Sequence, residues 1–201
     1  EKHVLIVKEN FDTVNFYEDY EERKCEVNKK IPVSITTILK RHQVESFDWM
    51  INAYEKGYPG ILNADDQGLG KTLQSIAFLA WLQENQESKK GEILPILIVA
   101  PTSLLRNWEN EVEHHMETKG LGIRIEAYGN RLKEYKGKLK GVDTDDSNEE
   151  TRLDFSSIIR PDKPTQTWIL TTYTTLTQYQ QSFAKLEFAA VVFDEIQNIK
   201  N

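Results

Sequence analysis

The sequence has only one cysteine, Cys25, so the chain can form no disulfide within itself and has no CxxC pair for zinc. A lone cysteine is typical of proteins from a reducing compartment. No run reaches the about 18 to 20 apolar residues that cross a bilayer, and no basic-then-apolar signal pattern opens the chain. We therefore expect an intracellular protein without a membrane partner, cytoplasmic if it is bacterial and nuclear if it is eukaryotic.

An excess of basic residues is missing as well. Lys and Arg number 25 against 32 Asp and Glu, which gives a formal net charge of -7. Proteins that hold nucleic acid through their overall charge have the opposite balance, so any such contact must be local here. At 201 residues, 39% hydrophobic and 28% charged, the chain has the composition of one folded globular domain.

Apolar periodicity predicts alternating strands and helices from about residue 38 onward. Helical spacing marks residues 47–54, and we expect strands at 60–64, 96–100, 123–127, 168–172 and 189–193, with helices at 71–84, 104–116 and 176–186. Repeated β-then-α units predict an α/β fold, a mainly parallel sheet flanked by helices on both faces.

Two stretches lie outside this pattern. Residues 1–37 show no clear period and are interpreted as a lead-in or the end of a preceding domain. The folded α/β domain itself is therefore expected at residues 38–201. Residues 141–151 are acidic and poor in apolar side chains, which predicts a mobile surface insertion. The chain begins with Glu1 and stops at Asn201 inside a patterned segment, so we expect the α/β domain to be truncated at its C-terminus.

The clearest chemical motif is DDQGLGKT at residues 65–72, between an expected strand and an expected helix. Gly68 and Gly70 let backbone N–H groups turn toward a phosphate chain, and Lys71 reaches the outer phosphates. Thr72 would place its hydroxyl on Mg²⁺. The pattern favours an ATP site with Mg²⁺, and an ordinary helix start is the alternative.

A pair of carboxylates, Asp194 and Glu195, follows the apolar run at residues 191–193. Phosphoryl transfer needs one carboxylate to hold the metal and a second group to orient or deprotonate the attacking water. Acids at the C-terminal end of a strand also lie where open α/β sheets bind ligands. A solvated turn is the alternative, and the phosphate loop upstream favours the functional interpretation.

These motifs, in this order, resemble the N-terminal RecA-like lobe of the Swi/Snf-type ATPases of helicase superfamily two, over about residues 39–201. The segment LKRHQ resembles the Q motif, whose glutamine, here Gln43, reads adenine. The phosphate loop is similar to the family's DEMGLGKT, in which Asp65 stands at the first position and Leu69 between the glycines. Asp66 and Gln67 depart from that pattern.

The segment DEIQ is similar to motif II of the family. The resemblance implies that Asp194 holds Mg²⁺, that Glu195 positions the attacking water, and that Gln197 links the nucleotide state to a second lobe. Lys71, Glu195 and Gln197 would then be the catalytic residues of this lobe.

Two further segments resemble the nucleic-acid motifs of the family, Ia at residues 98–111 and Ib at 170–173. Thr102, Ser103 and Thr172 are the candidate contacts, because hydroxyls and N–H groups at helix starts hold phosphate without net positive charge. The apolar side chains of the first segment, Trp108 among them, are interpreted as core packing.

The resemblance implies the ATP-binding lobe of a DNA-dependent ATPase that moves along duplex DNA or remodels protein–DNA complexes. Its partners would be the backbone of duplex DNA, a second RecA-like lobe in the parent chain, and DNA-bound proteins. Because the family's arginine fingers come from that second lobe, the chain alone is expected to be inactive. Two alternatives remain open: the motor subunit of a restriction or phage-defence complex, and a nucleotide-binding or interaction module without turnover.

Overall fold

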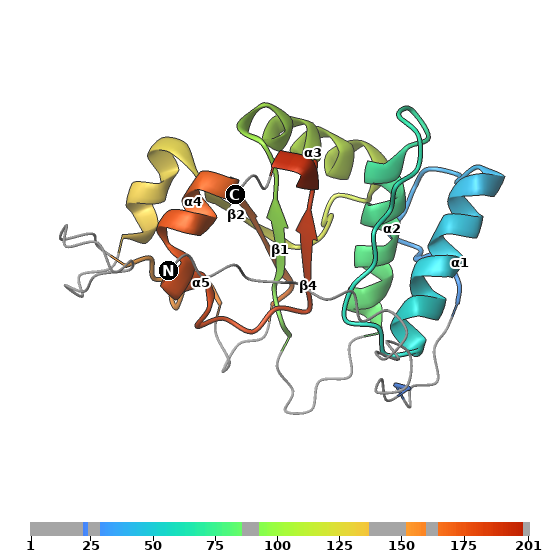
Figure 1. Ribbon diagram of the computed structural model, residues 1–201, viewed down its shortest axis with the longest axis horizontal. Helices are drawn as coiled ribbons and strands as arrows, with labels where there is room; N and C mark the ends of the chain where they lie inside the picture. Colours follow the sequence, from blue (N-terminus) through green and yellow to red (C-terminus); the bar gives the residue numbers. More distant parts are fainter. Residues whose placement is uncertain (1–21, 24–28, 86–92, 137–151, 160–164, 199–201) are drawn as a thin grey trace, which may run out of the picture.

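The computed structural model describes residues 22–23, 29–85, 93–136, 152–159 and 165–198 (Figure 1). Its centre is a four-stranded sheet in the order β2-β3-β1-β4, and every neighbouring pair is parallel. The strands are β1 (Ile96–Val99), β2 (Ile123–Ala127), β3 (Thr167–Thr171) and β4 (Ala190–Phe193). The predicted α/β fold is confirmed. The acidic segment 141–151 lies outside the described residues.

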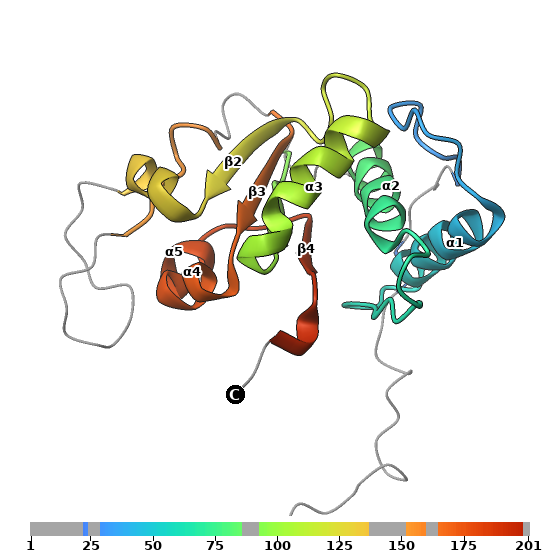
Figure 2. The same cartoon turned by 90° about the horizontal axis from the view of Figure 1, so that it is seen from above.

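Helices cover both faces of the sheet, because successive strand residues point to opposite sides. Ile96 and Ile98 pack on one face with α1 (Arg41–Glu55), α2 (Lys71–Glu84) and α3 (Thr102–His115). Leu97 and Val99 pack on the other with α4 (Tyr173–Gln178), α5 (Gln180–Phe183) and the 3-10 helix η1 (Gly129–Tyr135). Figure 2 shows these layers from above, and a short 3-10 helix, η2 (Ile196–Asn198), follows β4.

The apolar stripe of α1 fixes this helix against α2. Phe47 and Ile51 are fully buried, and each side chain of this size contributes about 1.5–3 kcal/mol on burial. Tyr54 near the end of α1 meets the buried ring of Trp81 of α2 edge to face, with centroids 5.5 Å apart. The two helices therefore form one unit, and α1 supports the helix that begins at the phosphate loop.

The strand predicted at residues 60–64 is wrong. The segment has no regular secondary structure, and the side chains of Ile61 and Leu62 are 39% and 66% exposed. A parallel strand exists only where a neighbour supplies the hydrogen-bond ladder, and no strand of the described sheet pairs with this segment. Instead Asn63 anchors it, donating from Nδ2 to Gln74 Oε1 at 2.7 Å. The helix predicted at 176–186 begins and ends earlier and is divided in two, α4 before Tyr179 and α5 after it.

The described part of the lead-in is bound to the lobe. The Thr36 N–H donates to the carbonyl of His115 at 2.9 Å, and the Glu117 N–H donates to the carbonyl of Ser34 at 2.9 Å. These bonds tie the segment to the end of α3. On α1, Lys29 pairs with Glu55 at 2.7 Å. Residues 1–21 and 24–28 lie outside the described residues.

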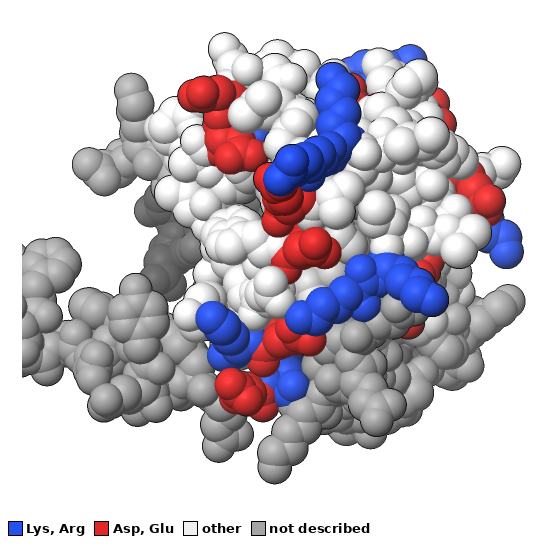
Figure 3. Space-filling view, turned by 90° about the vertical axis from the view of Figure 1, so that its right-hand side faces the viewer, with Lys and Arg blue, Asp and Glu red and all other residues white. Residues whose placement is uncertain are grey.

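The surface on the α1 side carries charges of both signs. Figure 3 shows Lys and Arg interspersed with Asp and Glu across this face. One exposed pair, Arg41 with Glu45 at 2.8 Å, joins successive turns of α1. The described side chains of this face therefore create no field of a single sign that would attract a polyanion. Within the ranges that the structure describes, no helix has the length and apolar character needed to cross a membrane.

Candidate functional site

The carboxyl ends of the parallel strands bring the predicted strand-end residues to one edge of the sheet. In register, Val99 of β1 lies between Thr171 of β3 and Phe193 of β4. The ladder continues one residue further, since the Asp194 N–H donates to the Val99 carbonyl at 2.9 Å. Thr172 and Asp194 therefore flank the turn that leads from β1 into α3, where Thr102 begins the helix. Ligands of open α/β sheets bind at such an edge.

The phosphate loop precedes α2 and turns on two glycines. Gly68 and Gly70 have φ of 87° and 80°, a region that residues with a Cβ rarely adopt. Lys71, the first residue of α2, donates from Nζ to the carbonyl of Asp65 at 2.6 Å and to that of Asp66 at 3.1 Å. The ammonium thus lies over the loop, where it can exchange these carbonyls for phosphate oxygens. Thr72 follows in the first turn and is half-buried.

A buried glutamine that the sequence analysis did not single out holds the loop together. Gln74 is fully buried, and its Oε1 accepts from Asn63 Nδ2 at 2.7 Å and from Ser46 Oγ at 3.0 Å. Its Nε2 lies 3.4 Å from both Asp65 Oδ2 and the Leu69 carbonyl. One amide therefore links α1, the preceding segment and the loop. A glutamine on the buried face of a helix was the available signal, because buried amides need partners.

Gln43 of α1 contacts the same Leu69 carbonyl as Gln74 and is 6% exposed. Its Oε1 accepts the Lys40 N–H at 2.9 Å, and its Nε2 donates to the Leu69 carbonyl at 3.2 Å. These two bonds start α1 and join it to the phosphate loop. Recognition of adenine by Gln43 stays a prediction. In the structure the same amide has a second role, because it joins α1 to the phosphate loop.

Asp194 is held by two aromatic side chains from different helices. Trp108 of α3 donates from Nε1 to Asp194 Oδ2 at 2.8 Å, and the Tyr173 hydroxyl of α4 donates to the Asp194 carbonyl at 2.6 Å. Burial, and then the charges of Asp194 and Glu195, raise the pKa of Tyr173, so its hydroxyl keeps its proton and donates. The interpretation of Trp108 as core packing is incomplete: its ring is 2% exposed, but its N–H binds the candidate metal carboxylate.

Glu195 departs from ordinary backbone geometry. Its φ is 52°, and it is the only residue other than glycine with positive φ in the described part of the chain. Such a conformation costs of order 1–3 kcal/mol and is found at functional sites. The Gln197 side chain donates to the Glu195 carboxylate from η2. The two residues assigned to water positioning and to coupling are therefore in direct contact, while their roles stay predictions.

The nucleic-acid candidates differ in how free their hydroxyls are. Thr102 and Ser103 are exposed in the first turn of α3, as a backbone contact requires. Thr172 caps α4: its Oγ1 accepts the Thr175 N–H at 3.1 Å and donates to Thr175 Oγ1 at 2.9 Å. Thr172 thus has a helix-capping role that explains its position without any ligand.

The core connects the loop to the strand ends. Ile76 and Ala77 of α2 belong to the same cluster as Ile98 of β1, and Val192 of β4 packs against it. In Figures 1 and 2, α2 lies beside the β4 side of the sheet. Among the described residues no group of three or more His, Cys, Asp or Glu could hold a metal ion. The fit to Mg²⁺ rests on Asp194, whose carboxylate has about four acceptor positions, of which Trp108 uses one.

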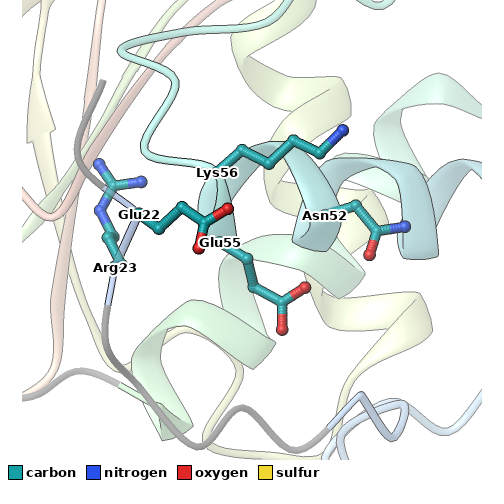
Figure 4. A pocket seen from close by; sticks show the side chains of 5 residues that line it. All are labelled: Glu22, Arg23, Asn52, Glu55 and Lys56. Atoms are coloured by element: carbon teal, nitrogen blue, oxygen red, sulfur yellow. The ribbon is translucent and has the colours of Figure 1, made fainter. Parts of the chain in front are cut away.

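A pocket of about 330 Å³ lies elsewhere, lined by Glu22, Arg23, Asn52, Glu55 and Lys56 (Figure 4). It opens at the C-terminal end of α1, whereas the phosphate loop contacts Gln43 at the N-terminal end, about 18 Å away along the helix. This pocket is formed by the lead-in on α1 and is separate from the phosphate loop.

Comparison with known proteins gives the family. A family model described as SNF2-related domain matches residues 42–201. The Zorya protein ZorD of Escherichia coli is 35% identical over 178 residues, 86% of this chain and 16% of its own length. The chromatin-remodeling ATPase INO80 of Pyricularia oryzae is 32% identical over 170 residues, 85% of this chain and 8% of its own length.

Helicase ssl-1 of Caenorhabditis elegans is 34% identical over 183 residues, 90% of this chain and 6% of its own length. The chain thus spans less than a fifth of each of these three relatives. The matched residues include the phosphate loop, the sheet and the strand-end carboxylates described above. The chain therefore belongs to the SNF2-related family, the Swi/Snf-type ATPases of helicase superfamily two, and forms their N-terminal RecA-like lobe.

Proposed function

We propose that the chain is the ATP-binding lobe of a DNA-dependent ATPase that translocates on duplex DNA or remodels protein–DNA complexes. The observation that carries the proposal is the strand register, which puts the start of α3, Thr172 and Asp194 at one edge of the sheet. Candidate nucleic-acid and metal residues are thereby neighbours. That arrangement suits an enzyme in which the DNA contact influences hydrolysis.

ATP and Mg²⁺ would be held by the residues around the start of α2. The loop glycines, Lys71 and the positive end of the helix would bind the phosphates, and Thr72 and Asp194 would hold the metal. Bound Mg²⁺ supplies neutralisation of charge on the phosphate oxygens. Glu195 would orient or deprotonate the attacking water, and Gln197, its hydrogen-bond partner, would report the nucleotide state.

Duplex DNA would be held through its backbone, by the hydroxyls and N–H groups of Thr102 and Ser103, with a smaller part for the capping Thr172. This mode needs no overall positive charge, in agreement with the net charge of -7. A second RecA-like lobe elsewhere in the full protein would supply the arginines that complete the site. We expect the protein to act on DNA inside the cell, in the nucleus if it is eukaryotic.

The test is phosphate release by the full-length protein with and without duplex DNA. We expect stimulation by DNA, and loss of both basal and stimulated turnover in Lys71→Ala. Turnover that does not respond to DNA would favour the alternative of a nucleotide-binding module. Normal turnover in Lys71→Ala would contradict the assignment of the phosphate loop.

A further inference from the structure

We propose that Trp108 and Tyr173 are positioning residues: they hold Asp194 and connect it mechanically to the two helix starts that carry the candidate nucleic-acid contacts. This inference rests on the proposed function, because it gives Asp194 the metal. It adds a physical link between the DNA contact and the metal site, made by side chains that touch neither ligand.

The indole N–H of Trp108 fixes the direction of the Asp194 carboxylate. The Trp108 ring is 2% exposed and its Nε1 lies 2.8 Å from Asp194 Oδ2. An indole N–H only donates, and it cannot rotate independently of the ring, so the packing of the ring in the core fixes the direction of the bond. A hydrogen bond to a charged acceptor is also stronger than one between neutral groups. The rotamer of Asp194 is therefore set by α3.

Tyr173 holds the backbone of the same residue. The Tyr173 hydroxyl lies 2.6 Å from the Asp194 carbonyl oxygen, and its ring stacks on Phe193 with centroids 6.3 Å apart. Tyr173 thus holds the end of β4 through both its hydroxyl and its ring. Because β4 is the last strand in the order β2-β3-β1-β4, its outer side has no described strand to fix it. The contact from α4 replaces part of that support.

Both donors lie on the helices whose starts carry the candidate nucleic-acid contacts. Trp108 lies about two helical turns beyond Thr102, on the same rigid helix. Tyr173 directly follows Thr172, as the first residue of α4. A shift of either helix start caused by bound DNA would move a donor that holds Asp194. The two motifs for nucleic acid and the metal carboxylate are thereby joined by two short contacts, with no flexible loop between them.

The competing explanation is that both rings only fill the core. It predicts that changing them lowers thermal stability and nothing else. The proposal predicts that the Mg²⁺ requirement for nucleotide binding and the stimulation by DNA also change. The variants Trp108→Phe and Tyr173→Phe keep most of each ring and remove the donor, so they separate the two explanations.

Matched controls are present in the same molecule. Trp81→Phe changes a fully buried tryptophan of α2 that packs on Tyr54 and Phe78. Tyr179→Phe changes a tyrosine that is 2% exposed, between α4 and α5. Trp81→Phe removes the same atoms as Trp108→Phe, and Tyr179→Phe removes the same hydroxyl as Tyr173→Phe. Both controls make these changes away from Asp194.

The experiment measures ATP binding to the full-length protein by calorimetry over a series of Mg²⁺ concentrations, with Asp194→Asn as the reference for a damaged metal site. We expect Tyr173→Phe to raise the half-saturating Mg²⁺ concentration about three- to tenfold, the effect of losing one neutral hydrogen bond. Trp108→Phe should raise it about tenfold or more, because the lost bond has a charged acceptor. The ratio of phosphate release with and without duplex DNA should fall in the same two variants. The two controls should change the melting temperature alone.

The outcomes separate this inference from the proposed function. If Asp194→Asn shifts the Mg²⁺ requirement but both donor variants behave like their controls, the positioning roles are wrong and the metal site stands. If Asp194→Asn leaves the Mg²⁺ requirement unchanged, Asp194 does not hold the metal, and the proposed site fails together with the inference. Should Trp108→Phe not fold, Tyr173→Phe, which lacks a single hydroxyl, decides the question.

Discussion

Gly70→Ala tests the contact between the phosphate loop and α1, and Gly68→Ala is its control. Both glycines have left-handed backbone, with φ of 80° and 87°. A Cβ at position 70 would collide with the side-chain amide of Gln43, whereas a Cβ at position 68 would have no heavy atom within 4 Å. The two substitutions therefore share the backbone strain, and only the first adds a collision.

The magnitude follows from the bonds that the collision breaks. Alanine in left-handed backbone costs roughly 1–2 kcal/mol at either position. At position 70 the Gln43 amide must also rotate away, which removes its bonds to Lys40 N at 2.9 Å and to the Leu69 carbonyl at 3.2 Å. At about 1 kcal/mol each, these bonds make Gly70→Ala about 2 kcal/mol less stable than Gly68→Ala. For a domain of this size the difference in melting temperature is about 4–8 °C.

The assay is thermal and urea unfolding of the wild type and the variants under identical conditions. In the Gln43→Ala background, Gly70→Ala should cost no more than Gly68→Ala does, because the colliding amide is gone. Equal midpoints for Gly68→Ala and Gly70→Ala in the presence of Gln43 would refute the reasoning. So would a cost of Gly70→Ala that stays the same when Gln43 is removed.

The ATP site and the half-buried Tyr128 give further tests. Lys71→Ala should remove most ATP affinity in a calorimetric titration, because the cation of the loop is lost, and unchanged affinity would contradict the phosphate-loop assignment. In the full-length protein, Glu195→Gln should leave ATP bound but slow hydrolysis strongly, whereas Asp194→Asn should weaken Mg²⁺ dependence and binding together; equal effects on affinity would count against separate roles. The isolated chain should release phosphate near background with or without duplex DNA, because an arginine finger is worth about a thousandfold or more; turnover within about tenfold of the stimulated full-length protein would argue against a second lobe. Burial, and then the hydrogen bond to Glu109, raise the pKa of Tyr128 above its usual 10.0. The stability that this group contributes is complete below pH 10.0 and falls as the pH rises above that value. Urea unfolding at a series of alkaline pH values should therefore show a smaller loss of stability in Tyr128→Phe than in the wild type.

The strands of the sheet could be predicted because each carries its own signal. Ile96–Val99 is an apolar run of the length of a buried strand, and Ile123–Ala127 alternates. The helix Lys71–Glu84 was predicted with both ends correct, since the loop glycine starts it and its apolar face is long. Residues 60–64 do not form a strand although they are predicted as one. Their apolar run has the same local signal, but a strand also needs a neighbouring strand, and a single segment does not contain that information.

The placement of the site could be predicted only in part, for a related reason. Acids and hydroxyls after apolar runs predict the edge of a parallel sheet, and Asp194 and Thr172 do flank the end of β1 there. The sequence did not reveal the local hydrogen bonds of these side chains. The Thr172 hydroxyl bonds to Thr175, and the Gln43 amide bonds to Lys40 and Leu69. Such bonds depend on side-chain direction, which residue spacing alone does not determine.

Trp108 shows why a residue beside a reacting group is hard to find in a sequence. Its position on the buried face of α3 is explained completely by core packing, because the apolar spacing is the same whether or not the indole N–H donates a hydrogen bond. The acceptor of that hydrogen bond is Asp194, which is 86 residues away along the chain and becomes a neighbour only through the parallel pairing of β1 and β4. Buried aromatic residues with a donor differ from other core residues in one respect: their N–H or O–H must find an acceptor. At the carboxyl edge of this sheet the acceptors are the carboxylate and the carbonyl of Asp194, so the core and the candidate metal site share the same residues there.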